Sequence, residues 1–205
     1  MDSISATTAM TKHLPNALTV LRVILIPVMI LFFYLPFEWS RFVSCWVFVA
    51  ASITDFLDGY FARKHQTFSK FGAFLDPVAD KLTVTTALII LLQDHPTVLM
   101  MIATAVIIGR EITISALRER MAELGARGVV NVAMVGKIKT VFQMTAIGFL
   151  LYEADLWFLP VYNIGLVLLY VAAGLTLYSM YVYLKAAWPL MKEEVTEDEL
   201  DEVGE

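Results

Sequence analysis

Residues 42–92 have the sequence FVSCWVFVAASITDFLDGYFARKHQTFSKFGAFLDPVADKLTVTTALIILL, and this stretch decides the fold. It begins with the apolar run Phe42–Thr54, ends with the apolar run Leu82–Leu92, and holds four aspartates in the polar segment between them. Each run approaches the roughly 20 residues that a transmembrane helix needs once its adjoining turns are included. The stretch therefore predicts two membrane-spanning helices joined by a polar connection.

The rest of the chain is equally apolar. Of its 205 residues, 59% are hydrophobic and 17% are charged, and the mean hydropathy is +0.70. A soluble domain of this length does not need so many apolar residues, so a membrane is the natural solvent. Six apolar stretches recur along the chain: Leu18–Leu35, Phe42–Thr54, Leu82–Leu92, Pro96–Gly109, Thr140–Tyr152 and Leu156–Leu184. We predict an all-α integral membrane bundle of six transmembrane helices.

The predicted helices form one domain over residues 18–190. Residues 1–17 precede it as a juxtamembrane segment, and residues 191–205 follow it as a tail. Residues 193–205 hold eight acidic residues and no basic one, which predicts a disordered tail. Without these residues the formal net charge of −5 becomes positive, with fifteen basic and twelve acidic residues, as suits a protein lying against anionic lipid.

The positions of the basic residues predict the orientation in the membrane. If the chain starts inside and crosses six times, the outer connections are Pro36–Arg41, Gln93–Thr97 and Glu153–Leu156. Of the fifteen Lys and Arg residues, only Arg41 lies in these connections. Because cytoplasmic connections carry the excess of positive charge, both termini are predicted to be cytoplasmic.

The four aspartates of the polar segment, Asp55, Asp58, Asp76 and Asp80, are the most specific feature. At about 100° per helical residue, the first pair is separated by about 60° and the second by about 40°, so each pair shares a helix face. Four acids at close range repel one another unless they are protonated or bind cations. Because the ligands are all oxygens, the group favours Mg²⁺ or Mn²⁺ over Zn²⁺.

The sequence offers less support for two other kinds of cation site. A histidine metal site is not expected, because His13, His65 and His95 are scattered over different connections. A cation-coupled transporter is the alternative from another functional class, since its intramembrane acids would bind the transported ion. Transporters place such sites near the midplane with access from both sides. Here the acids crowd one end of the predicted helices, which favours an enzyme.

Basic residues gather in the second half of the chain. Four of them form the predicted basic group: Arg110, Arg118, Lys137 and Lys139. The acids near them are Glu111 and Glu119. A phosphorylated substrate needs such a group, because guanidinium and ammonium donors bind phosphate oxygens. The alternative is that these residues set the topology at anionic headgroups.

Three polar residues open the first apolar stretch. Asn16, Thr19 and Arg22 are three residues apart and share one helix face. Arg22 is expected either to pair with an acid of the polar segment or to reach a bound nucleotide, whereas simple helix capping is the alternative for such residues. Small residues also interrupt the polar segment at Gly59, Ala62 and Gly72, where they permit close approach of a ligand or of another helix.

The polar segment fills every position of the pattern D-x-x-D-G-x-x-A-R, then, after a spacer, G-x-x-x-D-x-x-x-D, between Asp55 and Asp80. In this pattern the chain resembles the CDP-alcohol phosphatidyltransferases. The resemblance implies that the four aspartates hold two metal ions, which bridge the diphosphate of a CDP-linked lipid, and that Asp80 is the catalytic base. The nucleotide site that we then expect comprises Asp55, Asp58, Gly59, Ala62, Arg63, Gly72, Asn16 and Thr19.

Three further stretches, Pro15–Arg22, Gly109–Arg118 and Gly136–Thr140, are similar to the bacterial phosphatidylglycerophosphate synthases of this family. This similarity implies transfer of phosphatidyl from CDP-diacylglycerol to glycerol 3-phosphate, with the predicted basic group on the acceptor phosphate. Inositol phosphate, serine or phosphatidylglycerol remains the alternative acceptor. The resemblance further implies a homodimer among membrane lipids of the bacterial cytoplasmic membrane, with a cytoplasmic active site and no nucleic-acid polymer as partner.

Overall fold

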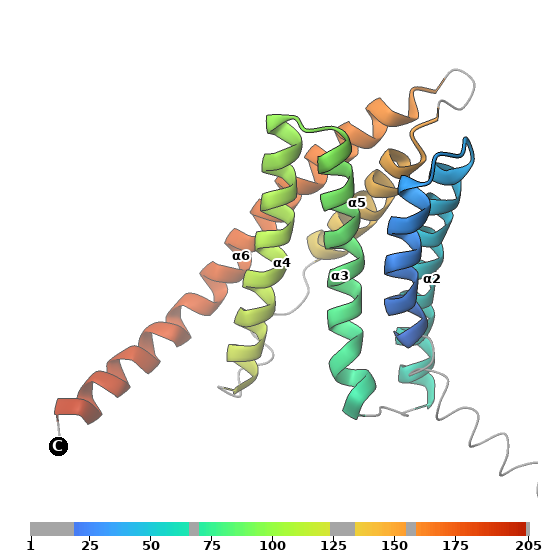
Figure 1. The fold of residues 1–205 in the computed structure, drawn as a ribbon. Helices are drawn as coiled ribbons and strands as arrows, with labels where there is room; N and C mark the ends of the chain where they lie inside the picture. The colour runs from blue at the N-terminus through green and yellow to red at the C-terminus, as the bar shows by residue number, and fades with distance from the viewer. Residues whose placement is uncertain (1–18, 66–69, 124–133, 155–158, 204–205) are drawn as a thin grey trace, which may run out of the picture. The chain divides into compact units, whose positions relative to one another are not determined.

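A computed structural model of the chain describes the backbone of residues 19–65, 70–123, 134–154 and 159–203, and the side chains at 19–55, 75, 77–123, 138–154 and 159–189. The described residues form six helices, which confirms the all-α prediction (Figure 1). In chain order they are Thr19–Tyr34, α2 (Ser40–His65), α3 (Lys70–Asp94), α4 (Val98–Glu123), α5 (Met134–Tyr152) and α6 (Val161–Val203).

The chain packs as two compact units, and we describe each by itself. Residues 1–97 and 144–167 make up the first unit, which contains the Thr19–Tyr34 helix, α2 and α3. Residues 98–143 and 168–205 make up the second unit, which contains α4 and most of α6.

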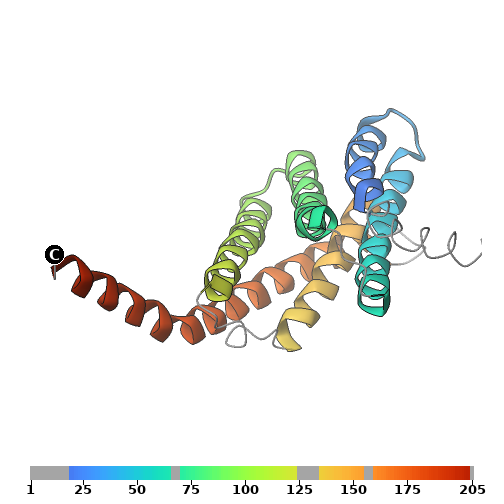
Figure 2. The ribbon, with the colours of Figure 1, turned by 90° about the horizontal axis from the view of Figure 1, so that it is seen from below.

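The first unit is built on contacts between its apolar helices. Figures 1 and 2 both show the Thr19–Tyr34 helix beside α2, and Ser44 of α2 donates a hydrogen bond of 3.1 Å to the carbonyl oxygen of Met29. The Cys45 thiol lies 3.3 Å from the carbonyl oxygen of Gly148 in α5. Both contacts are made by small side chains, Ser44 and Cys45, and small residues let helix backbones approach closely.

The second unit has a core between α4 and α6. Ile114, Leu117 and Met121 recur at helical spacing on α4 and pack against Tyr183 and Ala187 of α6. The cluster is buried, and no charged side chain belongs to it. The same face of α4 also carries Arg110, one turn before Ile114. The apolar core thus fixes the part of α4 from which Arg110 projects.

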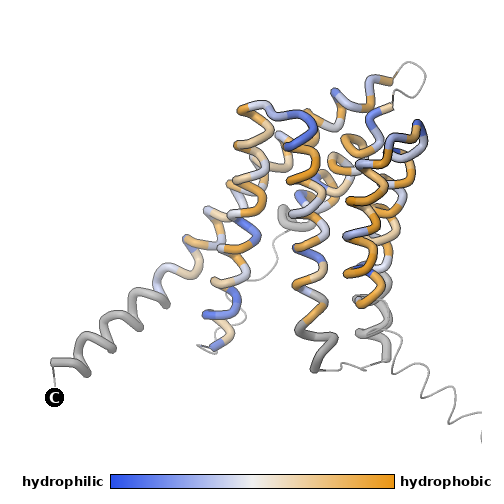
Figure 3. The backbone as a smooth tube through the Cα atoms, in the orientation of Figure 1, coloured by the Kyte–Doolittle hydropathy of each residue, from blue (hydrophilic) through white to orange (hydrophobic). Residues whose placement is uncertain are grey.

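Many large apolar side chains are exposed in both units, and apolar residues occur along all of the described helices (Figure 3). The segments Val98–Glu123 and Val161–Pro189 are long and apolar enough to cross a membrane, yet only 33% of the most apolar window of each is buried. A core helix of a soluble protein would be mostly buried, so these faces require an apolar solvent. The protein is therefore a multi-pass membrane protein.

One local expectation needs revision. Helix α6 continues to Val203, so the backbone of residues 191–203, which we expected to be disordered, is helical; Glu and Leu are favourable helix residues. Helix α3 begins at Lys70 and contains Pro77 in its interior. A proline at an interior position removes one backbone hydrogen bond and bends a helix.

Candidate active site

The polar segment lies on two helices that pack against each other. Asp55 and Asp58 belong to α2, whereas Asp76 and Asp80 belong to α3, and α2 contacts α3. Each pair is about one helical turn apart, as the sequence predicted. The described side chains of Asp55 and Asp80 are both partly exposed. The structure thus places two pairs of acids on adjoining helices, and the side chains of Asp58 and Asp76 lie outside the described ones.

Several predicted nucleotide ligands lie outside the described side chains or outside the described chain. Gly59, Ala62 and Arg63 belong to the backbone of α2, and Gly72 belongs to that of α3. Asn16 precedes the described residues. Thr19 is described and is 3% exposed, at the first residue of its helix.

Arg22 anchors Asp55 from the neighbouring helix. Its Nη1 lies 2.8 Å from Asp55 Oδ1, and the side chains of Arg22 and Asp55 are 1% and 38% exposed. A guanidinium buried this completely requires a countercharge. The pairing confirms one of the two roles expected of Arg22, and it holds one oxygen of Asp55 in place while the carboxylate remains partly exposed.

This pair also bears on stability. From the sequence alone, we expect that Asp55→Asn, Asp76→Asn or Asp80→Asn relieves repulsion among the acids and leaves the fold intact or stabilises it. The contact with Arg22 acts in the opposite direction at Asp55, because Asp55→Asn replaces a carboxylate that lies 2.8 Å from a buried guanidinium.

The second unit contains a buried basic cluster, which consists of Arg110, Glu111 and Lys139. Lys139 is 2% exposed, and its Nζ contacts Glu111 Oε1. Arg110 is 7% exposed, and its Nη1 lies 3.3 Å from the same oxygen. One carboxylate thus serves two buried bases. The cluster keeps an excess positive charge, which suits an anionic ligand.

Residues of α6 complete the surroundings of this cluster. Arg110 Nη2 donates a hydrogen bond of 3.4 Å to Ser179 Oγ. The guanidinium carbons of Arg110 and Arg118 lie 5.6 and 5.7 Å from the centre of the Tyr183 ring, at cation–π distance. Arg118 is exposed, unlike Arg110. The side chain of Lys137 lies outside the described residues, although its backbone belongs to α5.

The sequence did not predict Ser179 or Tyr183 as neighbours of the basic group. Ser179 is 69 residues from Arg110, and neither α6 residue belongs to a motif. For Glu111, the sequence predicts only an acid near the basic group and not its contacts with Arg110 and Lys139. No spacing rule joins residues of different helices, so only the packing of α4 against α6 could reveal these contacts.

Comparisons with known proteins show the family of the chain. The sequence profile of a family described as CDP-alcohol phosphatidyltransferase matches residues 12–178. A protein of Pseudomonas fluorescens is 49% identical over 186 residues, which cover 89% of this chain and 93% of that protein. Proteins of Shigella flexneri and Salmonella typhimurium are each 47% identical over 175 residues, covering 85% of this chain and 94% of each relative. All three relatives are named CDP-diacylglycerol--glycerol-3-phosphate 3-phosphatidyltransferase.

Proposed function

The chain belongs to the CDP-alcohol phosphatidyltransferase family, and on that premise we propose that it transfers the phosphatidyl group of CDP-diacylglycerol to glycerol 3-phosphate, yielding phosphatidylglycerol phosphate and CMP. The observation that carries the proposal is the identity of 47–49% to relatives of that name over most of both chains. The acidic and basic sites supply the chemistry that each substrate requires.

The acids of α2 and α3 are the proposed donor site. Asp55, Asp58, Asp76 and Asp80 would hold two ions of Mg²⁺ or Mn²⁺, because partly exposed carboxylate oxygens are the ligands that these hard cations prefer. When bound, such ions neutralise the diphosphate of the donor. Arg22 holds Asp55 Oδ1 in position. Gly59, Ala62, Arg63, Gly72, Asn16 and Thr19 complete the proposed nucleotide site.

The proposed transfer step needs one proton acceptor. The hydroxyl oxygen of glycerol 3-phosphate forms a bond to the lipid-linked phosphorus, and the bond from that phosphorus to the oxygen of CMP breaks. Asp80 receives the proton of the attacking hydroxyl as the bond forms. The partial exposure of the Asp80 side chain is compatible with this role.

The basic cluster is the proposed site for the acceptor phosphate. Arg110 and Lys139 both contact Glu111 Oε1, so two basic side chains meet at this point. Arg118 is exposed beside the same Tyr183 ring, and Lys137 belongs to the first turn of α5. A dianionic phosphate can accept hydrogen bonds from several of these donors, whereas serine and inositol carry no phosphate to accept them.

An apolar groove in the first unit supports a lipid substrate. It has a volume of about 700 Å³ and lies between α2 and α5, lined by residues that include Phe42, Trp46, Ile53 and Gly148. Ile53 precedes Asp55 by two residues on α2. We assign this groove to an acyl chain of CDP-diacylglycerol, because an acyl chain there would start beside the acid proposed to act on the diphosphate.

The proposed location follows from the same argument. The distribution of basic residues favours cytoplasmic termini and cytoplasmic ends for the helices that carry the acids. We place the enzyme in the bacterial cytoplasmic membrane with its active site facing the cytoplasm, and we propose a homodimer.

The proposed function is tested with purified protein, CDP-diacylglycerol, Mg²⁺ and a panel of acceptors. Glycerol 3-phosphate should give phosphatidylglycerol phosphate and CMP, both identified by mass spectrometry, and chelation of divalent ions should stop the reaction. Equal or better use of serine, inositol phosphate or phosphatidylglycerol would reassign the acceptor. CMP release alone does not distinguish these outcomes, so the lipid product must be measured.

A further inference from the structure

A cluster of four charged or titratable residues lies far from the acidic site along α3. Asp94 is the last residue of α3, His95 follows it, and Glu153 follows the last residue of α5. At 1.5 Å per residue, Asp94 is about 20 Å along the helix from Asp80. Arg41, at the second residue of α2, completes the cluster. None of these residues has a role in the proposed transfer reaction.

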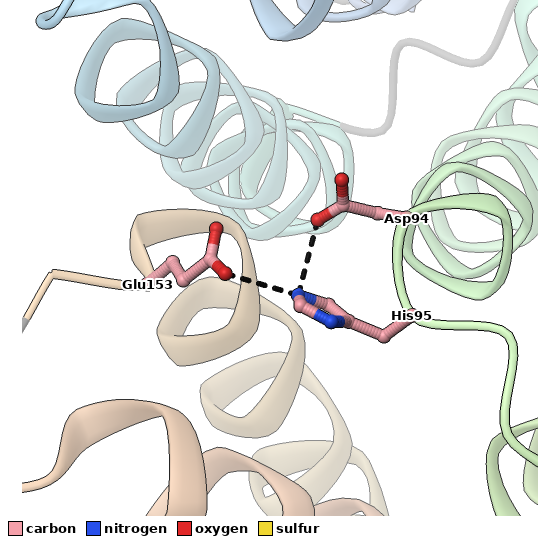
Figure 4. Close-up of side chains that lie close together, drawn as sticks. All are labelled: Asp94, His95 and Glu153. Atoms are coloured by element: carbon pink, nitrogen blue, oxygen red, sulfur yellow. Dashed lines mark hydrogen bonds and ion pairs between the residues drawn. The ribbon is translucent and has the colours of Figure 1, made fainter.

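Three side chains of the cluster converge on one point (Figure 4). His95 Nε2 lies 3.0 Å from Glu153 Oε1 and 3.1 Å from Asp94 Oδ2. One ligand atom from each of the three residues lies within 4.8 Å of the others. The ring of His95 also packs on the ring of Tyr162 at 4.7 Å, which limits its rotation.

Arg41 binds only the oxygens that point away from His95. Its Nη2 lies 2.8 Å from Asp94 Oδ1, and its Nη1 contacts Glu153 Oε2. Each carboxylate therefore gives one oxygen to Arg41 and turns the other toward His95. Arg41 thus orients both carboxylates.

One oxygen at the point of convergence lacks a hydrogen bond. Within the described part of the chain, Asp94 Oδ2 is enclosed from solvent and accepts no hydrogen bond. The nearby His95 Nε2 can give its single proton to Glu153, to which it is hydrogen-bonded. An enclosed carboxylate oxygen without a donor is costly unless a cation is present.

From this geometry we propose that Asp94, His95 and Glu153 form a second metal site, which binds Zn²⁺ through Asp94 Oδ2, His95 Nε2 and Glu153 Oε1. Three protein ligands of this kind, with a fourth position for water, suit tetrahedral zinc. The imidazole nitrogen disfavours Mg²⁺, which prefers oxygen. Arg41 acts as the outer partner that orients two ligands. The bound ion would join the end of α3 to the end of α5.

The backbone at Glu153 is consistent with a constrained ligand. Its φ of 57° lies in the left-handed region that few residues other than glycine adopt. This conformation ends α5 and directs the Glu153 side chain toward His95 (Figure 4).

The test is zinc binding to the purified full-length protein after removal of metals. Titration with ZnCl₂ in excess Mg²⁺, which occupies the oxygen-only acids, should show one zinc ion per chain by calorimetry and elemental analysis. X-ray absorption of the loaded protein should show one imidazole nitrogen among oxygen ligands. His95→Gln and Asp94→Asn should each lose this site, with affinity reduced at least about tenfold.

Glu38→Gln is the matched control, because Glu38 is an exposed carboxylate in the connection before α2 and is not a proposed ligand. This variant should bind zinc as the wild type does. Mg²⁺-dependent phosphatidyl transfer should persist in His95→Gln, which shows that the variant is folded. Failure of the wild-type protein to bind zinc under these conditions, or unchanged binding in His95→Gln, would overturn the proposal and leave the cluster as an ion-pair network.

Discussion

The Arg22–Asp55 pair of the first unit and the basic cluster of the second unit both pair buried basic side chains with a carboxylate, but their surroundings differ in charge. At both places the basic side chains are buried and the acid is the more exposed partner. The side chain of Arg22 is 1% exposed against 38% for that of Asp55, and the side chain of Lys139 is 3% exposed against 28% for that of Glu111. The first pair lies on helices beside the further acids of α2 and α3, whereas in the second unit Arg110 and Lys139 both contact Glu111. We therefore expect the first to favour a cation and the second to favour an anion.

The largest expected effect is on kcat, when the proposed proton acceptor Asp80 is changed. Asp80→Asn should lower kcat by roughly 10²–10⁴-fold, because an amide cannot accept the proton of the attacking hydroxyl. The rate of phosphatidylglycerol phosphate formation measures it. Asp94→Asn, which changes the other end of the same helix α3, is the control and should retain the wild-type rate. Wild-type turnover in Asp80→Asn would remove Asp80 from the mechanism.

The basic cluster should affect one substrate only. Lys139→Met or Arg118→Ala should raise the KM for glycerol 3-phosphate roughly tenfold to a hundredfold, as expected for about 1.5–3 kcal/mol from a charge-assisted hydrogen bond. The KM for CDP-diacylglycerol should change little. Arg120→Ala is the matched control for Arg118→Ala, because Arg120 is also an exposed arginine of α4 but pairs with Glu123.

If both KM values rise together in Lys139→Met, the basic cluster serves the fold or the shared phosphates and not the acceptor alone. An equal effect of Arg120→Ala would show that general positive charge, and not the particular cluster, attracts glycerol 3-phosphate.

The buried member of the first pair predicts an effect on stability. Asp55→Asn should cost about 1–3 kcal/mol of unfolding free energy, since the buried Arg22 guanidinium loses the carboxylate that lies 2.8 Å from it. The double variant Arg22→Met with Asp55→Asn should recover most of that loss without recovering activity, because the buried guanidinium is removed together with this carboxylate. Thermal unfolding in detergent measures the stability of both variants. A fully stable Asp55→Asn protein would mean that water or another residue satisfies Arg22.

The smallest effect is expected in the apolar groove. Gly148 lines this groove, and a Cβ placed there would meet nothing within 4 Å. Gly148→Leu should therefore fold normally while it fills part of the groove, and raise the KM for long-chain CDP-diacylglycerol several-fold. A short-chain donor should be used as before. Gly174→Leu, at a helical position with equal space, should change neither KM.

Some contacts followed from spacing along the chain. The alternation of apolar and polar stretches predicted the six helices, and the pattern from Asp55 to Asp80 predicted two acid pairs on α2 and α3. Arg22 was expected to meet either an acid or a nucleotide, and only the packing of the first helix against α2 selected Asp55. The choice depends on the register between two helices, which no single-helix pattern contains.

The ends of the helices show where sequence reasoning stops. From the sequence, His95 is not expected to bind a metal, because the histidines are scattered along the chain. That reasoning considers only other histidines as partners. The structure brings His95 to Glu153, 58 residues later, and to Arg41 through the shared carboxylates. A side chain on a connection has no periodicity that indicates its neighbour, so such clusters cannot be predicted from spacing.

The sequence alone was enough to predict the apolar solvent, the helical class and the placement of the acids as two pairs, because hydropathy and carboxylate spacing are local properties along the chain. Only the tertiary structure decided the partners: Asp55 for Arg22, Glu111 for both Arg110 and Lys139, and Glu153 for His95. Buried charges must be paired, but which opposite charge is near depends on how separate helices pack. Sequence therefore predicts that a countercharge exists, and the fold selects it.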